Sequence, residues 1–329
     1  MSLRHIHLAL ALDGAVTADE PVSARHWVDQ VQRAEAGLLD FVTIEDGFTL
    51  GRLDASLIAA RVAPVTSRIG IVPTVTTTHT EPFHVSKTIA TLDYASTGRA
   101  GWHAQVGAGA EEAPLFGRRD PAELRRESLL VEAADHVEAV RRLWDSWEDD
   151  AEIRDAATGR FIDREKLHYI DFVGTRFSVR GPSITQRPPQ GQPIVVANAH
   201  DPSEYAFAAG SADIALVTPR TVEEIPEIVR EIRDAQVVAG RGDDRLLIFG
   251  DLDVSPDLAD QLVAWADAGL DGFRLRPSGG ARDIAIVTGG LVPQLQARGR
   301  FRRAYEDDVR TLRGLLGFER PANRYAVTA

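Results

Sequence analysis

Short apolar runs alternate with amphipathic stretches along most of this chain. Residues 5–12 (HIHLALAL) alternate in polarity and predict a strand, and apolar residues then recur at helical spacing from Trp27 to Leu38, behind the capping residue Ser23. Seven more apolar runs predict strands at 41–44, 69–75, 99–106, 194–197, 213–217, 246–251 and 272–276. Between the runs, helical spacing predicts helices at 55–62, 82–92, 123–147, 201–210, 221–239, 256–268 and 281–296.

The alternation of strands and helices is typical of parallel βα units in an α/β fold, and eight such units close a (β/α)₈ TIM barrel. We expect residues 1–329 to form a single domain with an inserted hairpin region at about 148–190, built from strands at 167–172 and 176–179. A doubly wound open sheet is the alternative. The first strand-to-helix turn, 13–16, lacks the glycine-rich dinucleotide fingerprint, which favours the barrel.

Charge and composition narrow the function. The chain has 37 basic and 49 acidic residues and a formal net charge of −12, which disfavours nucleic acid and anionic membranes as partners. It has no cysteine, so disulfides, thiol nucleophiles and cysteine-bound metals are excluded. No signal-like segment opens the sequence and no apolar run has the length of a membrane helix, so we expect a cytoplasmic protein.

A barrel carries its active site at the carboxyl ends of its strands. That rule selects Asp13, Glu45, Asp46, 74–79, 103–107, 198–201, Thr218, Asp251 and 276–278. The segment 96–107, with its Trp102-His103 pair, is interpreted as the floor of the site. Glu45 and Asp46 point to opposite sides of their strand, and a helix cap is an equally good interpretation of either acid.

His5 and His7 lie on one face of the first predicted strand, and His200 follows the fifth. Such a set can hold a metal. The first two histidines open their strand, however, which places them at the wrong end of a barrel. We therefore expect no metal site.

Several segments together resemble a known family. The segments on which the resemblance rests are 74–84 (TVTTTHTEPFH), 92–102 (LDYASTGRAGW), 143–147 (LWDSW), 159–163 (GRFID), 177–182 (FSVRGP) and 187–193 (RPPQGQP). As a set they are similar to the bacterial-luciferase-like flavin-dependent monooxygenases, in the branch of nitrilotriacetate and dibenzothiophene-sulfone monooxygenases. The resemblance covers most of the chain from Asp40 onward. It implies a TIM barrel, reduced FMN supplied by a partner flavin reductase, activation of dioxygen, and a homodimer or higher homo-oligomer.

The resemblance also implies roles for single residues. Asp46 matches an acid beside the flavin ring, and Thr76 and Thr77 match the turn that lines it. His103 stands where this branch commonly has Asn. It is the expected catalytic residue, either hydrogen-bonding a flavin edge or donating a proton near neutral pH.

Other positions depart from the family. A His and a Tyr that contact the flavin side chain and phosphate are replaced by Arg126 and Leu130, and Arg126 is the residue expected to hold the phosphate. In the Gly-Ser loop after the fifth barrel strand, Asp201 takes the place of the serine and Glu204 that of a glycine. These carboxylates would repel a phosphate unless Arg126 or His200 offsets them.

We therefore expect a flavin-dependent monooxygenase that oxidises a small organic substrate with reduced FMN and dioxygen. The hairpin at 160–182 is expected to be part of a lid over the site. Three alternatives stay open: a deazaflavin-dependent oxidoreductase on the same barrel, a non-catalytic partner subunit that has lost flavin binding, and, most remote, a metal-dependent hydrolase. The sequence does not name the substrate.

Overall fold

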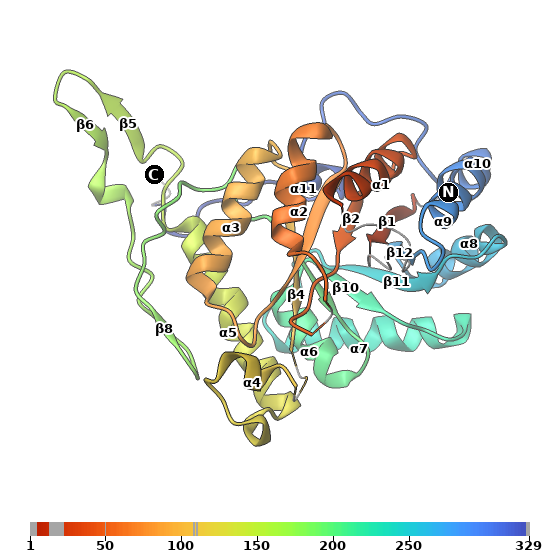
Figure 1. The fold of residues 1–329 in the computed structure, drawn as a ribbon, viewed down its shortest axis with the longest axis horizontal. Coiled ribbons are helices and arrows are strands. Elements are labelled where there is room, and N and C mark those ends of the chain that lie inside the picture. The colour runs from red at the N-terminus through yellow and green to blue at the C-terminus, as the bar shows by residue number, and fades with distance from the viewer. Residues whose placement is uncertain (1–4, 13–22, 50, 108, 110, 327–329) are drawn as a thin grey trace.

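Eight parallel strands close into a barrel at the centre of the molecule (Figure 1). A computed structural model describes residues 5–12, 23–49, 51–107, 109 and 111–326. Around the barrel the strand order is β1-β12-β11-β10-β9-β4-β3-β2. The strands are β1 (His7–Leu12), β2 (Phe41–Ile44), β3 (Gly70–Thr76), β4 (Gly101–Gln105), β9 (Ile194–Asn198), β10 (Ile214–Val217), β11 (Leu247–Asp253) and β12 (Gly272–Arg276). The predicted TIM barrel is confirmed.

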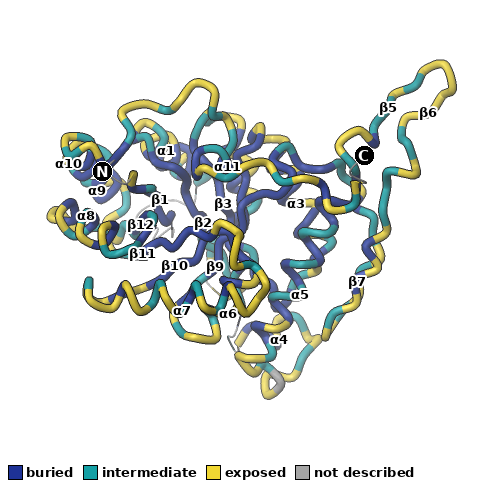
Figure 2. Tube along the Cα trace, turned by 180° about the vertical axis from the view of Figure 1, so that it is seen from behind, coloured by how far each residue is buried: buried dark blue, intermediate teal, exposed yellow. Residues whose placement is uncertain are grey.

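Helices surround the barrel and turn their apolar faces towards it, so that the centre is buried and the outer surfaces are exposed (Figure 2). They are α1 (Ala24–Ala36), α2 (Ala55–Val62), α3 (Pro82–Ala95), α5 (Arg126–Asp145), α6 (Pro202–Ser211), α7 (Ile225–Val238) and α8 (Leu258–Ala268). The last predicted helix comprises α9 (Ala281–Ile286), a π-helical turn (Val287–Leu291) and α10 (Val292–Ala297). Ser23 caps α1 as expected, since its hydroxyl accepts a hydrogen bond from the backbone N–H of Arg25.

The chain between β4 and α5 is less regular than the sequence suggests. A short helix, α4 (Ala113–Phe116), follows β4, and a 3₁₀ turn (Pro121–Glu123) precedes α5. The long helix therefore begins at Arg126 rather than at 123. Because α4 follows the end of β4, it lies at the carboxyl ends of the barrel strands.

The segment between α5 and β9 contains two hairpins instead of the one expected. The first pairs β5 (Glu152–Asp155) with β6 (Arg160–Ile162), and the second pairs β7 (Phe172–Val173) with β8 (Ser178–Val179). The expected strand at 167–172 is wrong, since Leu167 forms only an isolated bridge with Trp147. Strands of two to four residues that are largely exposed carry no apolar periodicity by which a sequence could reveal them.

The first of these hairpins is not part of the expected lid. Figure 1 shows β5 and β6 projecting away from α4, towards the opposite end of the molecule. The β7–β8 hairpin packs along the outer side of α5, where Phe172 and Ile170 meet Leu143. At its turn, the backbone N–H of Thr175 donates to Asp135 Oδ2 on α5 at 2.7 Å. The first hairpin thus projects away from the strand ends, whereas the second lies along α5 with its tip on the side of α4 (Figure 1).

The half of the barrel interior that lies towards the amino ends of the strands is apolar, and the chain closes it at that end. Ala9, Phe41, Val72, Val196 and Phe249 pack there against Leu312 and Leu316, which come from the short helix α11 (Leu312–Leu315) and the residue after it. Leu312 fits because Gly70 has no side chain: a Cβ at that position would lie 2.5 Å from Leu312 Cδ1. Leu312 and Leu316 therefore plug the barrel interior at the amino ends of the strands.

Within the described ranges, none of the helices combines the length and the apolar character needed to cross a membrane.

Candidate active site at the carboxyl ends of the strands

From this apolar layer towards the carboxyl ends of the strands, the barrel interior becomes polar. Successive side chains of a strand alternate between its two faces, so a residue two positions beyond an inward-facing one also points inward. Phe41 and Val72 belong to the apolar layer, which places Thr43 and Thr74 above them. The upper layer, called the polar layer below, consists of Thr43, Thr74, His103, Asn198, Asp251 and Arg274.

His103 forms the centre of one half of the polar layer. Its Nδ1 lies 3.1 Å from Thr74 Oγ1 on β3, and its Nε2 lies 3.1 Å from Asn198 Oδ1 on β9. Because a carbonyl oxygen only accepts, Nε2 carries the hydrogen and Nδ1 accepts from the Thr74 hydroxyl. The amide oxygen of Asn198 is therefore the atom that meets His103, and the amide nitrogen is left as a donor at the carboxyl end of β9.

The imidazole of His103 is neutral at physiological pH. Burial and the nearby charge of Arg274 lower its pKa from 6.5 to about 3. So low a pKa disfavours the expected role of His103 as a proton donor near neutral pH, and that role stays a prediction. Its other expected role, as a hydrogen-bonding group of the site, stays a prediction.

An ion pair forms the other half of the polar layer. Arg274 on β12 donates to Asp251 on β11 through Nε at 2.9 Å and Nη2 at 2.7 Å, and Arg276 reaches the same carboxylate at 3.2 Å. Burial alone would raise the pKa of Asp251, but the hydrogen bond and charge of Arg274 outweigh it and hold the pKa below its usual range. The strand-end rule selects Asp251 from the sequence. It misses Arg274, which lies within a strand and carries no local signal of facing inward.

Four buried polar atoms beside the ends of β3 and β4 have no hydrogen-bond partner in the described part of the chain. They are Thr78 Oγ1, His79 Nε2, Gln105 Oε1 and Glu112 Oε2. His79 stacks on Phe116 of α4 at a centroid distance of 4.7 Å, and its Nε2 lies 3.9 Å from Glu112 Oε2. Burial lowers the pKa of His79, and burial together with the charge of Glu111 raises that of Glu112. Unsatisfied buried groups of this kind are costly unless a ligand or water pairs with them.

The sequence identifies part of this set. His79 and Gln105 belong to the segments selected at the strand ends, whereas Glu112 was missed. The only signal for Glu112 is an acidic pair, Glu111-Glu112, placed a few residues after a barrel strand.

Asp46 is engaged with the backbone. Its Oδ2 accepts from the N–H of Ala55, the first residue of α2, at 2.8 Å, and its Oδ1 accepts from Gly47 N–H at 2.7 Å. Burial raises its pKa. Asp46 thus accepts from the first backbone N–H of α2, although the N-cap residue of that helix is Asp54, and contact of Asp46 with a flavin ring stays a prediction.

Thr76 and Thr77 are buried at the end of β3. The hydroxyl and the backbone N–H of Thr77 both donate to the carbonyl oxygen of Gln105, at 3.1 and 2.8 Å. The Thr77 side chain therefore ties β3 to β4.

Arg126 and His200 come together with the two carboxylates that the family pattern lacks. Arg126 Nη2 lies 2.9 Å from Asp201 Oδ2 and 2.6 Å from Glu204 Oε1. His200 Nδ1 lies 3.4 Å from Glu204 Oε2. Leu130, one turn after Arg126, is buried in the main hydrophobic core. Arg126 thus offsets the negative charge of Asp201 and Glu204, as expected. Its own charge is neutralised by these carboxylates instead of by a phosphate.

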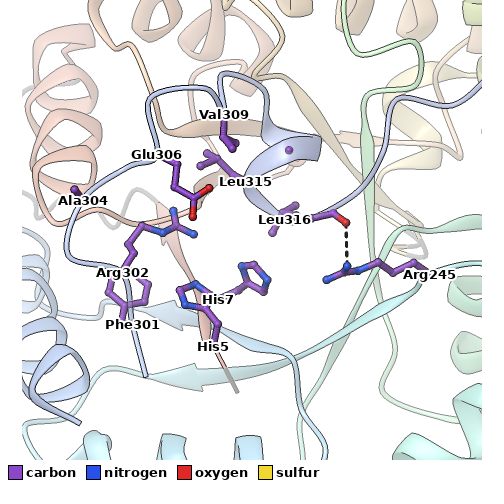
Figure 3. A pocket seen from close by; sticks show the side chains of 12 residues that line it. His5, His7, Arg245, Phe301, Arg302, Ala304, Glu306, Val309, Leu315 and Leu316 are labelled. Atoms are coloured by element: carbon purple, nitrogen blue, oxygen red, sulfur yellow. Dashed lines mark hydrogen bonds between the residues drawn. The ribbon is translucent and has the colours of Figure 1, made fainter. Parts of the chain in front are cut away.

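Other sequence candidates do not join the site. Glu45 pairs with Arg52 at 3.4 Å, and Asp13 lies outside the described residues. His5 and His7 line a cavity of about 430 Å³ at the plugged end of the barrel, beside Arg302 and across from Leu316 (Figure 3). Among described residues, no group of three or more His, Asp or Glu side chains is arranged to hold a metal ion.

Comparison with known proteins agrees with this architecture. The model of the luciferase-like monooxygenase family matches residues 5–303. An N-acetyl-S-(2-succino)cysteine monooxygenase of Bacillus subtilis (strain 168) is 27% identical, covering 94% of this chain and 93% of that protein. A crystal structure of a long-chain alkane monooxygenase superposes with a TM-score of 0.86 at 20% identity, covering 95% of both chains.

The branch suggested by the sequence is also represented. Component A of nitrilotriacetate monooxygenase from Aminobacter aminovorans is 30% identical over 68% of this chain, and a dibenzothiophene-sulfone monooxygenase of Rhodococcus erythropolis is 33% identical over 60%. The matched regions span 54% and 43% of those two proteins. The chain thus corresponds to nearly the whole of one relative and about half of the others.

Proposed function

The chain belongs to the luciferase-like monooxygenase family, and on that premise we propose that it oxidises a small organic molecule with dioxygen and a reduced flavin delivered by a separate flavin reductase. The family uses reduced FMN, which supplies the electrons for activating dioxygen. One observation carries the proposal: a neutral, buried His103 fixes the amide of Asn198 as a donor at the open end of a barrel whose other end is plugged.

The ring of a flavin fits the polar groups at the mouth. A flavin ring presents both hydrogen-bond donors and acceptors along one edge, and the mouth offers both kinds. Asn198 supplies a donor, Gln105 Oε1 an unpaired acceptor and Thr78 Oγ1 an unpaired hydroxyl. These groups would gain partners that the described protein does not give them.

The phosphate of FMN does not fit the side chains expected to hold it. Arg126 is already paired with Asp201 and Glu204, which leaves its surroundings with more negative than positive charge. We therefore assign the ring, and not the phosphate, to the described site.

Within this proposal, His103 is a positioning residue. It acts through Asn198, because the hydrogen on Nε2 selects one orientation of the amide. The low pKa of His103 keeps that orientation the same across the physiological range of pH. Arg274 and Asp251 neutralise each other beside it, so the floor of the site presents fixed dipoles rather than net charge.

The proposal is tested by supplying reduced flavin from a reductase to the purified protein in ¹⁸O₂ and searching small organic compounds for incorporated label. Organosulfur compounds and aminopolycarboxylates are the first choices, because relatives are named for oxidising them. Label in a product that depends on the protein supports the proposal. Free reduced flavin also consumes dioxygen, so the reaction without the protein is the control. A protein that binds no flavin would contradict the proposal.

One observation favours a second candidate. The guanidinium of Arg126 pairs with Asp201 and Glu204, and the side chain of Leu130 is buried. A barrel that has lost its flavin would show the same two features. Such a chain would serve as a non-catalytic partner subunit. Equilibrium dialysis against FMN, riboflavin and a deazaflavin separates the candidates, since the non-catalytic barrel binds none of them and a deazaflavin-dependent oxidoreductase prefers the last. Light scattering on the same sample measures the expected homodimer.

A further inference from the structure

The start of α6 is filled by carboxylates of the protein itself. Asp201 Oδ1 accepts from the backbone N–H groups of Ser203 and Glu204, each at 3.0 Å, and from the Ser203 hydroxyl. Glu204 Oε2 accepts from His200 N–H at 2.8 Å. The donors that a helix N-terminus ordinarily offers to an anion are thus already in use.

Among the described residues, one arginine pairs with these two carboxylates. Arg126 comes from the first turn of α5, and Nη2 contacts both Asp201 and Glu204. Two carboxylates face one guanidinium, so Arg126 offsets only one of the two negative charges. A phosphate dianion placed here would meet repulsion from the two carboxylates, and the N–H groups at Arg126 Nη2 and at the start of α6 are already in use.

Two other helix starts around the mouth follow the same arrangement. Asp46 accepts from the first N–H of α2, and Asp283 Oδ2 accepts from Ser278 N–H at 2.9 Å and Gly279 N–H at 2.7 Å, just before α9. The loop between β1 and α1 lies mostly outside the described residues, but its sequence at 13–22 (DGAVTADEPV) contains three acids and no base.

We propose that this barrel binds reduced flavin lacking the 5′-phosphate, a riboflavin-type ligand, in preference to FMN, because Asp201 and Glu204 occupy the place and the donors that the phosphate would need. The inference rests on the proposed function, since it concerns the flavin of the same site. It makes Asp201 and Glu204 determinants of flavin specificity. The protein would then distinguish between flavins by the end of the ribityl chain, where FMN carries its phosphate, and not by the flavin ring.

The experiment is an anaerobic titration of the protein with reduced riboflavin and, separately, with reduced FMN, followed by the change in ligand absorbance. We expect riboflavin to bind about tenfold more tightly than FMN, the size expected for a few exposed charges acting over short distances in water. The difference should shrink as salt is raised, because exposed charges are screened.

Matched variants test whether the two carboxylates cause the preference for riboflavin over FMN. Asp201→Asn with Glu204→Gln keeps the shape of both side chains and frees Arg126, and Asn remains a good helix cap, so the fold is expected to survive. The double variant should tighten FMN binding about tenfold and leave riboflavin binding within about twofold. Asp253→Asn is the control, since Asp253 is an exposed acid of the rim that pairs with Arg276 and does not touch α6. It should change neither affinity by more than about twofold.

The outcomes are distinct. FMN binding tenfold more tightly than riboflavin to the unaltered protein would overturn the inference and leave the proposed function standing. The phosphate would then have found donors elsewhere on the rim, such as the exposed Arg220. Equal effects of the double variant on both flavins would also overturn the inference, because the two carboxylates would not distinguish the phosphate. Failure of both flavins to bind would contradict the proposed function itself.

Discussion

His103 Nε2 lies 3.1 Å from Asn198 Oδ1, which joins two adjacent barrel strands whose residues are 95 positions apart in the chain. Thr74 completes this line of hydrogen bonds from the other side, at 3.1 Å from His103 Nδ1. The arrangement leaves the Asn198 amide nitrogen as a donor at the carboxyl end of β9, and the proposed function rests on this donor.

His103→Ala removes both hydrogen bonds and leaves a cavity beside two buried polar partners. We expect the free energy of unfolding to fall by about 2–4 kcal/mol, and turnover to be abolished in the folded fraction. Urea denaturation measures the first effect, and the oxygenase assay the second. His103→Asn restores a hydrogen-bonding amide and should recover part of kcat with little change in KM. Full activity of His103→Ala would remove this residue from the mechanism.

The stability of the fold should fall as the pH is lowered below about 6.5, the pKa of a histidine in the unfolded chain. The pKa of His103 in the folded protein is about 3, and burial lowers that of His136 to about 3 as well. Between these values the unfolded chain binds more protons than the folded one, so protonation favours unfolding. The contribution is complete above pH 6.5 and is lost towards pH 3.

Urea denaturation at half-unit intervals between pH 4.5 and 7.5 tests this prediction. His103→Asn removes one titrating group and should reduce the slope by up to about 1.4 kcal/mol per pH unit. A slope unaltered by this substitution would mean that His103 is protonated as easily in the folded protein as in the unfolded chain.

Asp251→Asn breaks the buried pair with Arg274. The guanidinium would remain buried with its counter-charge gone, and we expect a loss of about 3–5 kcal/mol in the free energy of unfolding. Glu227→Gln is the control, because Glu227 forms an exposed pair with Arg230 on α7 and should show no measurable change. Thermal unfolding followed by circular dichroism compares the two variants. Equal stabilities would show that Arg274 finds another partner.

Leu312→Ala opens the plug at the amino ends of the strands. Leu312 is completely buried against Gly70 and Phe41, and its truncation should cost about 2–5 kcal/mol. Leu57→Ala, at a side chain that is 71% exposed on α2, should stay within about 0.5 kcal/mol of the unaltered protein. Chemical denaturation of both variants measures the difference. A small effect of Leu312→Ala would indicate that the barrel interior is filled without α11.

The sequence by itself determined the barrel. Most of the barrel strands contain a short apolar run, and the outer helices carry apolar residues at every third to fourth position, because the faces that are buried against the core must be apolar. The rule that active sites lie at the carboxyl ends of strands then selected His103, Asn198 and Asp251 without any coordinates. The hairpin β5–β6 was missed because its exposed, charged residues leave no such trace.

Only the tertiary structure decided which of these groups meet. Arg126 and Asp201 are 75 positions apart, and the sequence left open whether the arginine would hold a phosphate or a carboxylate. Arg274 lies on the last barrel strand, and its partner Asp251 could be identified only once β11 and β12 were paired in register. The low pKa of His103 likewise depends on burial by residues that several strands contribute. Burial, pairing and charge state are properties of the closed barrel, because they arise from residues that only barrel closure brings within a few ångströms of one another.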